Sequence, residues 1–344
     1  MRGLLIAAAA LCLMAGGARA AGTKTVNDWT GVCSNVGNCA AFGFAAEDAD
    51  TDAYLRVDRA AGPAAAPSVL IAFDPADTQP NATWTLELDG RPIAGVGPAR
   101  AVGSEGGARA QLSGPTALAL IEALRNGKTL AIVADDKTIA TVSLAGSAAI
   151  LLWVDDQQGR VGTVTALAKP GSKPASAVPP PAPRPLIAPA PAVSQAGLPK
   201  FAPKSLIKGV SDCDLTGVDT PDDIVARLAP GLVLWGPECQ MGAYNEVSIF
   251  FLGDEHAGHL KRLSFSEAAG ADQASDDELV NASFDPKTRT ISMFAKGRGP
   301  GDCGEAASWV WDGKSFRLLS ESAMSECRGV SPDDWTALYE ARTK

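Results

Sequence analysis

The chain has 344 residues, of which 46% are apolar and 20% are charged, and its formal net charge at pH 7 is −9. This apolar content is too high for a fully disordered chain, and the negative charge is opposite to that of a protein that binds nucleic-acid phosphates. The composition therefore predicts a folded protein with no nucleic-acid partner.

Residues 1–20 have the pattern of a signal peptide. Arg2 supplies a positive start, residues 4–14 form a short apolar run, and Ala18-Arg19-Ala20 is the small-x-small pattern that a signal peptidase reads. The run is too short to span a membrane, and no later stretch reaches twenty apolar residues. We expect cleavage after Ala20 and a periplasmic or secreted product with a net charge of −11, because cleavage removes two arginines and no acid.

Residues 21–168 predict an N-terminal α+β domain in which antiparallel strands precede two helices. Strand-like residues occupy 29–44, around a turn, and then 54–58, 68–73 and 83–88, where Asp89-Gly90 signals a hairpin. Apolar residues at helical spacing predict a helix over 115–126, and a second helix is expected over 144–158, closed by Gly159. A short hairpin of 129–133 and 138–142 is expected between the two helices.

Residues 169–203 contain eleven prolines and no acidic residue. Proline lacks a backbone donor and restricts the residue before it, so polyproline II is the expected conformation. We interpret this Pro/Ala-rich segment as a semi-rigid linker that holds two domains apart. A ligand for a proline-recognition module is the alternative.

Residues 204–344 predict a C-terminal domain that is mainly an antiparallel β meander. A short helix is expected over 221–228 and a closing helix over 332–341. Between them, strands are expected over 232–235, 246–252, 260–265, 278–284, 290–294, 308–311 and 315–319. The fold class predicted for the whole chain is α+β, in two domains.

Six cysteines follow the expected cleavage site, and Cys12 is discarded with the signal peptide. An even number behind an export signal indicates disulfides. Cys33 and Cys39 are alone in the first predicted domain, so we pair them. The other four allow three pairings, of which we favour Cys213–Cys239 with Cys303–Cys327.

Several motifs along the chain resemble those of a known family of secreted bacterial proteins, the domain of unknown function 1176. These motifs are Asp28-Trp29 with the first cysteine pair, 144–149, 155–160, 242–245, 296–299, 301–304, 311–313, 327–329 and Asp334-Trp335. The resemblance covers nearly the whole mature chain, and the length and the six cysteines agree with it, but it implies no activity. Residues 21–168 are also distantly similar to the invasion-associated locus B family of envelope proteins, which implies a periplasmic, non-enzymatic role by analogy.

The two histidines, His256 and His259, lie in the segment Gly253-Asp-Glu-His-Ala-Gly-His259. Two histidines three residues apart beside carboxylates are a weak candidate for a transition-metal site. The flanking glycines favour the alternative, an exposed hairpin loop without metal.

Two further segments have candidate ligand-binding residues. Lys296 and Arg298 lie in a glycine-rich stretch whose backbone amides could hold an anion, or which could simply be a tight connection to Cys303. Trp309 and Trp311 share one face of a predicted strand, where exposed indoles would stack on sugars and buried ones would form a core.

The sequence lacks the usual catalytic groupings, such as a Gly-x-Ser-x-Gly elbow. We expect no catalytic residue and no cofactor, and we interpret the chain as a binding or interaction protein whose partner is an envelope protein or glycan. The alternatives are a glycan- or peptide-acting hydrolase that uses carboxylates, an inhibitor of a cationic wall hydrolase, and a sensor of small anions or sugars.

Overall fold

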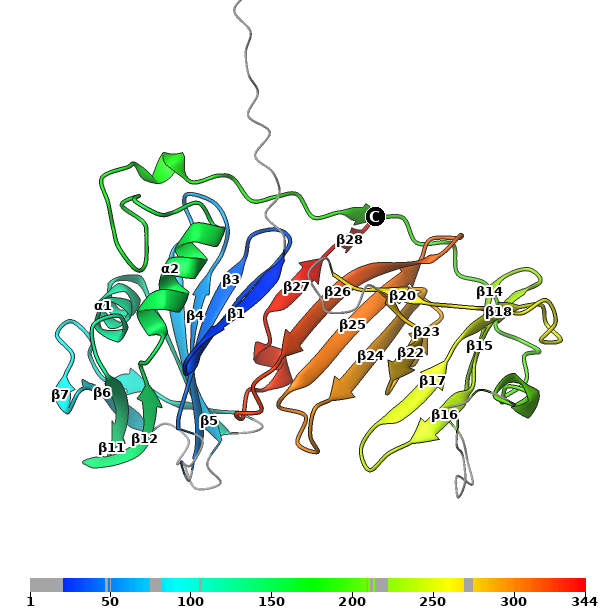
Figure 1. Ribbon diagram of the computed structural model, residues 1–344, viewed down its shortest axis with the longest axis horizontal. Helices are drawn as coiled ribbons and strands as arrows, with labels where there is room; N and C mark the ends of the chain where they lie inside the picture. The colour runs from blue at the N-terminus through cyan, green and yellow to red at the C-terminus, as the bar shows by residue number, and fades with distance from the viewer. Residues whose placement is uncertain are drawn as a thin grey trace, which may run out of the picture.

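The computed structural model describes residues 21–46, 49, 51–74, 82–104, 107–208, 210, 213, 222–268 and 275–344. The predicted signal peptide lies outside these residues. The described chain is built mostly of antiparallel sheets with two α-helices, which fits the α+β class (Figure 1). None of its helices is long and apolar enough to cross a membrane.

A seven-stranded antiparallel sheet forms the centre of residues 21–113. Its strands, in spatial order, are β1 (Gly22–Val26), β2 (Trp29–Cys33), β3 (Cys39–Phe44), β4 (Asp52–Arg59), β5 (Pro67–Asp74), β10 (Gly107–Ser113) and β9 (Val102–Ser104). Every residue of β2 and β3 is buried, because neighbouring parts of the molecule cover both faces of the sheet at these strands.

Both helices pack against one face of this sheet, α1 (Gly114–Leu124) over β5 and β10 and α2 (Ser147–Gln157) over β2 and β3. They lie where the sequence predicts them. Helix α2 begins after Gly146, whose φ is 99° and where a Cβ would lie 1.9 Å from the Val26 carbonyl oxygen, so only glycine fits.

A second sheet closes the same hydrophobic core. It consists of β12 (Lys137–Ser143), β11 (Thr129–Ala134), β6 (Thr83–Leu88) and β7 (Arg91–Pro92), and β8 (Ala99–Arg100) also pairs with β6. Trp84, Leu86 and Ile132 point inward and pack with residues of the seven-stranded sheet. The hairpin predicted between the helices is therefore confirmed.

Residues 222–344 form a series of antiparallel sheets, as the predicted meander requires. The strands are β14 (Ile224–Ala229), β15 (Leu232–Gly236), β18 (Phe251–Gly253) and β19 (Lys261–Arg262) in one sheet, β16 (Glu238–Met241), β17 (Glu246–Ile249) and β22 (Glu278–Val280) in a second, β20 (Phe265–Ser266) with β21 (Ser275–Asp276), and β23 (Ser283–Asp285), β24 (Thr290–Lys296), β25 (Gly304–Trp311), β26 (Phe316–Met324) and β27 (Ala337–Glu340) in the largest. Their core is rich in aromatic residues.

Two predicted helices are wrong. Within 221–228, the residues from Ile224 onward belong to strand β14, in which Ala226 and Leu228 alternate inward with a period of two. The segment 332–341 has one 3₁₀ turn at Pro332–Asp334 and then strand β27, which pairs with β26 and extends the largest sheet. Pairing with a neighbouring strand overrides the weak local preference for helix in both segments.

The Pro/Ala-rich segment 169–203, which we call the strap, is not the free spacer that its composition suggests. It runs along the molecule between α2 and β14 (Figure 1). Pro179 packs on Gly159 and Pro181 on Gly62, two glycines with positive φ. Its strand β13 (Leu186–Ile187) pairs in parallel with β28 (Arg342–Thr343).

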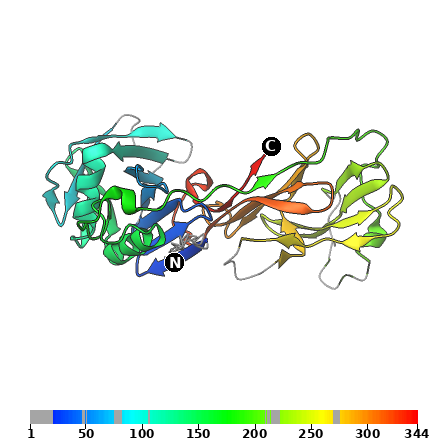
Figure 2. The same cartoon turned by 90° about the horizontal axis from the view of Figure 1, so that it is seen from above.

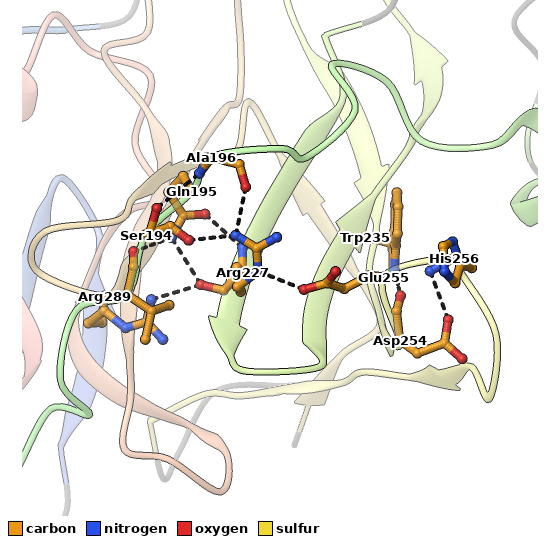
Figure 3. Close-up of polar contacts among 10 residues, drawn as sticks. Ser194, Gln195, Ala196, Arg227, Trp235, Asp254, Glu255, His256 and Arg289 are labelled. Carbon is orange, nitrogen blue, oxygen red and sulfur yellow. Dashed lines mark hydrogen bonds and ion pairs between the residues drawn. The ribbon is translucent and has the colours of Figure 1, made fainter.

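The far end of the strap is fixed by Arg227 on β14. The Arg227 guanidinium donates to the carbonyl oxygens of Ser194 at 2.7 Å and Ala196 at 3.0 Å, and the Gln195 amide exchanges hydrogen bonds with the Arg227 backbone (Figure 3). The strap thus contacts the structure on both sides of the boundary that we predicted between two domains.

The N-terminal and C-terminal parts also share a hydrophobic cluster. Residues of β3 and β4 such as Phe42 and Tyr54 pack there with Met324, Val330 and Trp335. The molecule is elongated, with the two parts side by side (Figure 2). The boundaries at residues 168 and 204 stay a prediction, but the two parts touch directly rather than being held apart.

The described cysteines form three disulfides, Cys33–Cys39, Cys213–Cys239 and Cys303–Cys327. This is the sequential pairing favoured from the sequence. Such bonds persist in oxidising compartments, so they indicate an extracytoplasmic location.

Candidate functional site

The two histidines lie in an exposed loop organised by Asp254. Its carboxylate accepts hydrogen bonds from the backbone N–H groups of His256 at 2.9 Å and Gly258 at 2.8 Å and contacts His259 Nδ1 at 3.0 Å (Figure 3 shows Asp254 and His256). The bond from Gly258 and those from His259 and His256 lower the pKa of Asp254 to about 2. Among the described residues there is no group of three or more His, Cys, Asp or Glu side chains placed to hold a metal.

The proposed anion site at Arg298 is already filled by a carboxylate of the chain itself. Arg298 binds Asp302 in a bidentate manner, with Nε–Oδ1 and Nη2–Oδ2 distances of 2.7 and 2.5 Å, and its Nη2 lies 3.6 Å from Asp52. Asp302 also accepts the Gly329 N–H at 2.7 Å. Lys296 contributes its backbone, which exchanges hydrogen bonds with the Asn245 amide. The glycine-rich segment therefore serves as a connection between chain segments.

Trp309 and Trp311 are buried in the core, so of the two alternatives stated for these indoles, the structure has the core one. The Trp309 indole N–H donates to the Ser266 carbonyl oxygen at 2.6 Å, and its ring packs against Phe265. Trp311 packs against Phe316. Both indoles therefore lie in the hydrophobic core beside the sheet and not at the solvent-exposed surface.

A different site lies between β4, α1 and the segment that follows α2. It is a groove of about 360 Å³, which we call the Arg59 groove. Its lining residues are Arg59, 63–67, Leu118, Ile121, Glu122, Arg125, 164–167 and Pro170. This volume is within the range of small-molecule pockets.

Two regular elements position the polar groups of the groove. Arg59 is the last residue of β4 and lies on the same face as Leu55 and Val57, the face turned toward the helices. Leu118 and Ile121 on α1 and the C-cap residue Arg125 are spaced at i, i+3 and i+7, so one side of the helix forms a wall of the groove.

The walls are apolar and open to solvent. Leu118 and Val164 are 52% and 56% exposed, so their alkyl groups are accessible from solvent. Alanines and prolines of 63–67 complete the surface.

The Arg59 side chain lies deep in this site and is only 3% exposed. It donates one hydrogen bond, from Nη2 to the Thr165 carbonyl oxygen at 3.2 Å, and its buried Nε–H has no partner among the described atoms. Most buried polar groups of native proteins are paired, and the Nε–H of Arg59 is one of a few buried side-chain atoms without a partner among the described residues.

A second buried guanidinium, that of Arg160, lies near Arg59. It is fully satisfied, because it donates to the Gln158 side chain at 2.7 Å, to Thr165 Oγ1 at 3.1 Å and to the carbonyl oxygens of Ala60 at 3.3 Å and Gly62 at 2.6 Å. Arg160 thereby holds the loop after β4 against the end of α2.

Asp155 is the buried carboxylate of this cluster. Its two oxygens accept the backbone N–H groups of Leu167 and Ala168, each at 2.8 Å, while burial raises its pKa. Burial also lowers the pKa of Arg59, to about 10, and the nearby Arg160 charge lowers it further while Asp155 opposes this. Asp155 thus acts electrostatically on both guanidiniums, while its oxygens accept hydrogen bonds from backbone N–H groups, so these three groups carry a surplus positive charge at neutral pH.

Arg125 adds a third guanidinium at the rim of the groove. It donates to the carbonyl oxygens of Leu167 at 3.0 Å and Ala168 at 3.1 Å, and it pairs with the exposed Glu122 carboxylate at 3.2 Å. An apolar groove with surplus positive charge can bind an apolar molecule that ends in an anion.

Sequence reasoning missed this site. Residues 155–160 carry a motif of the family resemblance, but from the sequence they predict only the end of the helix expected over 144–158. Arg59 has no local signal beyond its place at the end of a strand. Three segments separated by many residues form the groove, so its composition could not be seen from spacing.

Comparisons with known proteins place the chain in a family. A family model described as "Protein of unknown function (DUF1176)" matches residues 23–342. The protein described as "Uncharacterized protein YpfG" from Escherichia coli (strain K12) is 28% identical over 353 residues, which covers 93% of each chain. No solved structure matches. The comparisons do not show the likeness to invasion-associated locus B proteins.

Proposed function

The chain belongs to the DUF1176 family of proteins of unknown function, and we propose that it is a periplasmic binding protein whose Arg59 groove takes an apolar molecule ending in a carboxylate. The three disulfides and the predicted signal peptide support the compartment. The envelope is the setting in which we expect its ligand, and the predicted likeness to invasion-associated locus B proteins agrees with that setting.

The surplus guanidinium of Arg59 is the single observation on which this proposal rests. A buried charge without a full set of partners is costly to the folded state. A carboxylate in the groove would supply the missing countercharge. Turning the guanidinium toward that carboxylate would break no existing hydrogen bond of Nε, since this atom has none among the described residues.

The apolar walls of the groove favour a ligand whose remaining part is an alkyl chain. Each methylene group that leaves water for an apolar surface contributes about 0.8 kcal/mol. Leu118, Ile121 and Val164 offer such a surface along the groove. A carboxylate with an alkyl chain should therefore bind more tightly than acetate.

The same residues favour binding over catalysis. Hydrolysis of a glycan by carboxylates needs two acids on either side of the scissile bond. The groove is lined instead by guanidiniums, alkyl groups and a single exposed carboxylate, Glu122. Inhibition of a cationic wall hydrolase stays a second prediction. It rests on the acidic net charge alone.

Isothermal titration of the mature chain, residues 21–344, with octanoate, 1-octanol and acetate tests the proposal. Octanoate should bind at least tenfold more tightly than either of the others, because it alone has both the charge and the alkyl chain. The variant Arg59→Met should lose this preference for octanoate over octanol. The matched control Arg317→Met, at an exposed position on β26, should keep it.

Equal affinities of wild-type protein for octanoate and octanol would refute the proposal, as would an unchanged octanoate affinity in Arg59→Met. Circular dichroism melting of both variants checks that each is folded.

A further inference from the structure

The opposite face of the seven-stranded sheet has a second pocket, of about 250 Å³, which we call the Asp334 pocket. Its lining residues are Arg56, Asp58, Leu70, Val102, Arg109, Gln111 and Asp334. Side chains alternate along β4, so Arg56 and Asp58 face this pocket while Arg59 faces the groove. The two sites are therefore separate.

Strand register brings the residues of the pocket together. Arg56 on β4, Leu70 on β5 and Gln111 on β10 lie in one row across the sheet. Arg109 lies in an adjacent row on the same face, beside Val102 of the edge strand β9. The 3₁₀ turn at 332–334 brings Asp334 over this face from the C-terminal part.

Asp334 connects the side chains of the pocket. It accepts the Tyr54 hydroxyl at 2.5 Å, and its Oδ1 and Oδ2 atoms lie 3.3 Å from guanidinium nitrogens of Arg56 and Arg109, respectively. Arg56 also donates from Nε to Asp58 at 2.7 Å. The four charged residues that line the pocket, two arginines and two aspartates, carry a net charge of zero.

Two of these groups have unused binding capacity. Arg109 is 33% exposed, its contact with Asp334 is long, and its buried Nε–H has no partner among the described atoms. Asp58 is 30% exposed and accepts its hydrogen bond from Arg56 through Oδ1. Burial raises the pKa of Asp58 although Arg56 opposes this, so its anion would gain from a further cation.

From this arrangement we propose that the Asp334 pocket binds a small zwitterion, an amino acid with an apolar side chain. Its carboxylate binds the Arg109 guanidinium, which turns toward the pocket without breaking a bond of Nε, and its ammonium group binds Asp58. Leu70 and Val102 contact its side chain. A neutral zwitterion preserves the charge balance of the pocket, whereas a simple anion would upset it.

Titration of the mature chain with L-valine, 3-methylbutanoate and isobutylamine tests this proposal. The second compound is valine without the ammonium group, and the third is valine without the carboxylate. Valine should bind at least tenfold more tightly than either. Heteronuclear NMR should place the largest valine-induced methyl shifts on Val102 and Leu70, a readout that needs no variant.

Two variants assign the two ends of the ligand. Arg109→Gln should weaken valine at least tenfold, while the matched control Arg91→Gln, on β7 of the other sheet, should bind like wild type. In Asp58→Asn the affinity for valine should fall to that for 3-methylbutanoate.

Equal binding of 3-methylbutanoate and valine to the wild type would show a simple anion site and overturn the proposal. So would unchanged valine affinity in Arg109→Gln, or the absence of valine-induced shifts at Val102. Octanoate binding is measured in the same samples, and its loss in Arg59→Met bears only on the Arg59 groove.

Discussion

The buried charge of Arg59 lowers the free energy of unfolding, and its side chain lines an open groove. Its charge is buried, its Nε–H is unpaired and one hydrogen bond, to Thr165, holds it. Residues that break a rule of stability are expected at functional sites. Arg160, by contrast, is a structural residue, because its guanidinium donates hydrogen bonds to buried acceptors on three neighbouring segments of the chain.

This contrast predicts opposite effects of the same substitution. Arg59→Met should leave the free energy of unfolding unchanged or raise it by about 1 kcal/mol, because an apolar side chain replaces an incompletely paired buried charge. Arg160→Met should lower it by about 3 kcal/mol, because buried carbonyl oxygens lose their donor. Urea unfolding at constant m-value measures both. A loss of more than about 1 kcal/mol in Arg59→Met would contradict the idea that Arg59 is retained for binding.

The histidine loop gives a second prediction for single residues. The carboxyl of Asp254 should titrate near pH 2 in ¹³C NMR spectra, and His259→Ala should raise that pKa part of the way toward 3.8, since the Gly258 hydrogen bond remains. A depressed carboxyl pKa stabilises the folded state above the unfolded value, and this contribution is lost as the pH falls from about 4 through 2. An unchanged pKa in His259→Ala would show that the imidazole has no part in the loop.

At the scale of elements, Glu340 on β27 connects three segments. Its Oε1 accepts hydrogen bonds from Ser34 at 3.0 Å and Asn38 at 2.9 Å, in the turn closed by the first disulfide, and its Oε2 pairs with Arg184 of the strap at 2.5 Å. Near its midpoint, the strap is therefore held by this carboxylate and by the short β13–β28 pairing.

Loss of this carboxylate should loosen the strap. In Glu340→Ala, the amides of Arg342 and Lys344, which donate to the Pro185 and Ile187 carbonyl oxygens, should exchange with deuterium at least tenfold faster than in wild type. The control Glu87→Ala, on β6, should leave their exchange unchanged. Equal protection in wild type and Glu340→Ala would mean that Glu340 does not hold the midpoint of the strap.

Elements with strong local patterns were predictable from the sequence, and elements defined by distant partners were not. Helix α1 has its apolar residues at helical spacing and Pro115 near its start, so its limits were predicted within two residues. Strands β14 and β27 look helical in isolation and become strands because a neighbour pairs with them. The strap has the composition of a free polyproline segment, and its contacts depend on glycines and carboxylates far away in the sequence.

The candidate sites were the least predictable part of the molecule. The sequence draws attention to histidines, a glycine-rich loop and paired tryptophans. In the structure, His259, Arg298 and Trp309 from these three motifs have partners within the chain. Arginines at strand ends have no such pattern, and their surplus charge is visible only once Asp155 is seen to act electrostatically on more than one guanidinium.

For the whole molecule, the shared cluster predicts that the two parts unfold together. Trp335 packs against Phe294 and lies in one cluster with Phe42 and Tyr54 of the N-terminal sheet. The mature chain should show one calorimetric transition whose calorimetric and van't Hoff enthalpies agree. Trp335→Ala should lose about 3 to 5 kcal/mol of stability and separate the melting into two transitions. Two transitions in the wild type would instead favour two independent domains.

Binding of an apolar carboxylate in the Arg59 groove can be located directly by methyl NMR of the mature chain during titration with octanoate. The largest shift changes should fall on Leu118, Ile121 and Val164, which line the groove, and should saturate with one affinity. In Arg59→Met these changes should require at least tenfold more octanoate. Shifts centred on other methyl groups, or none up to millimolar octanoate, would contradict the assignment of this groove as the binding site.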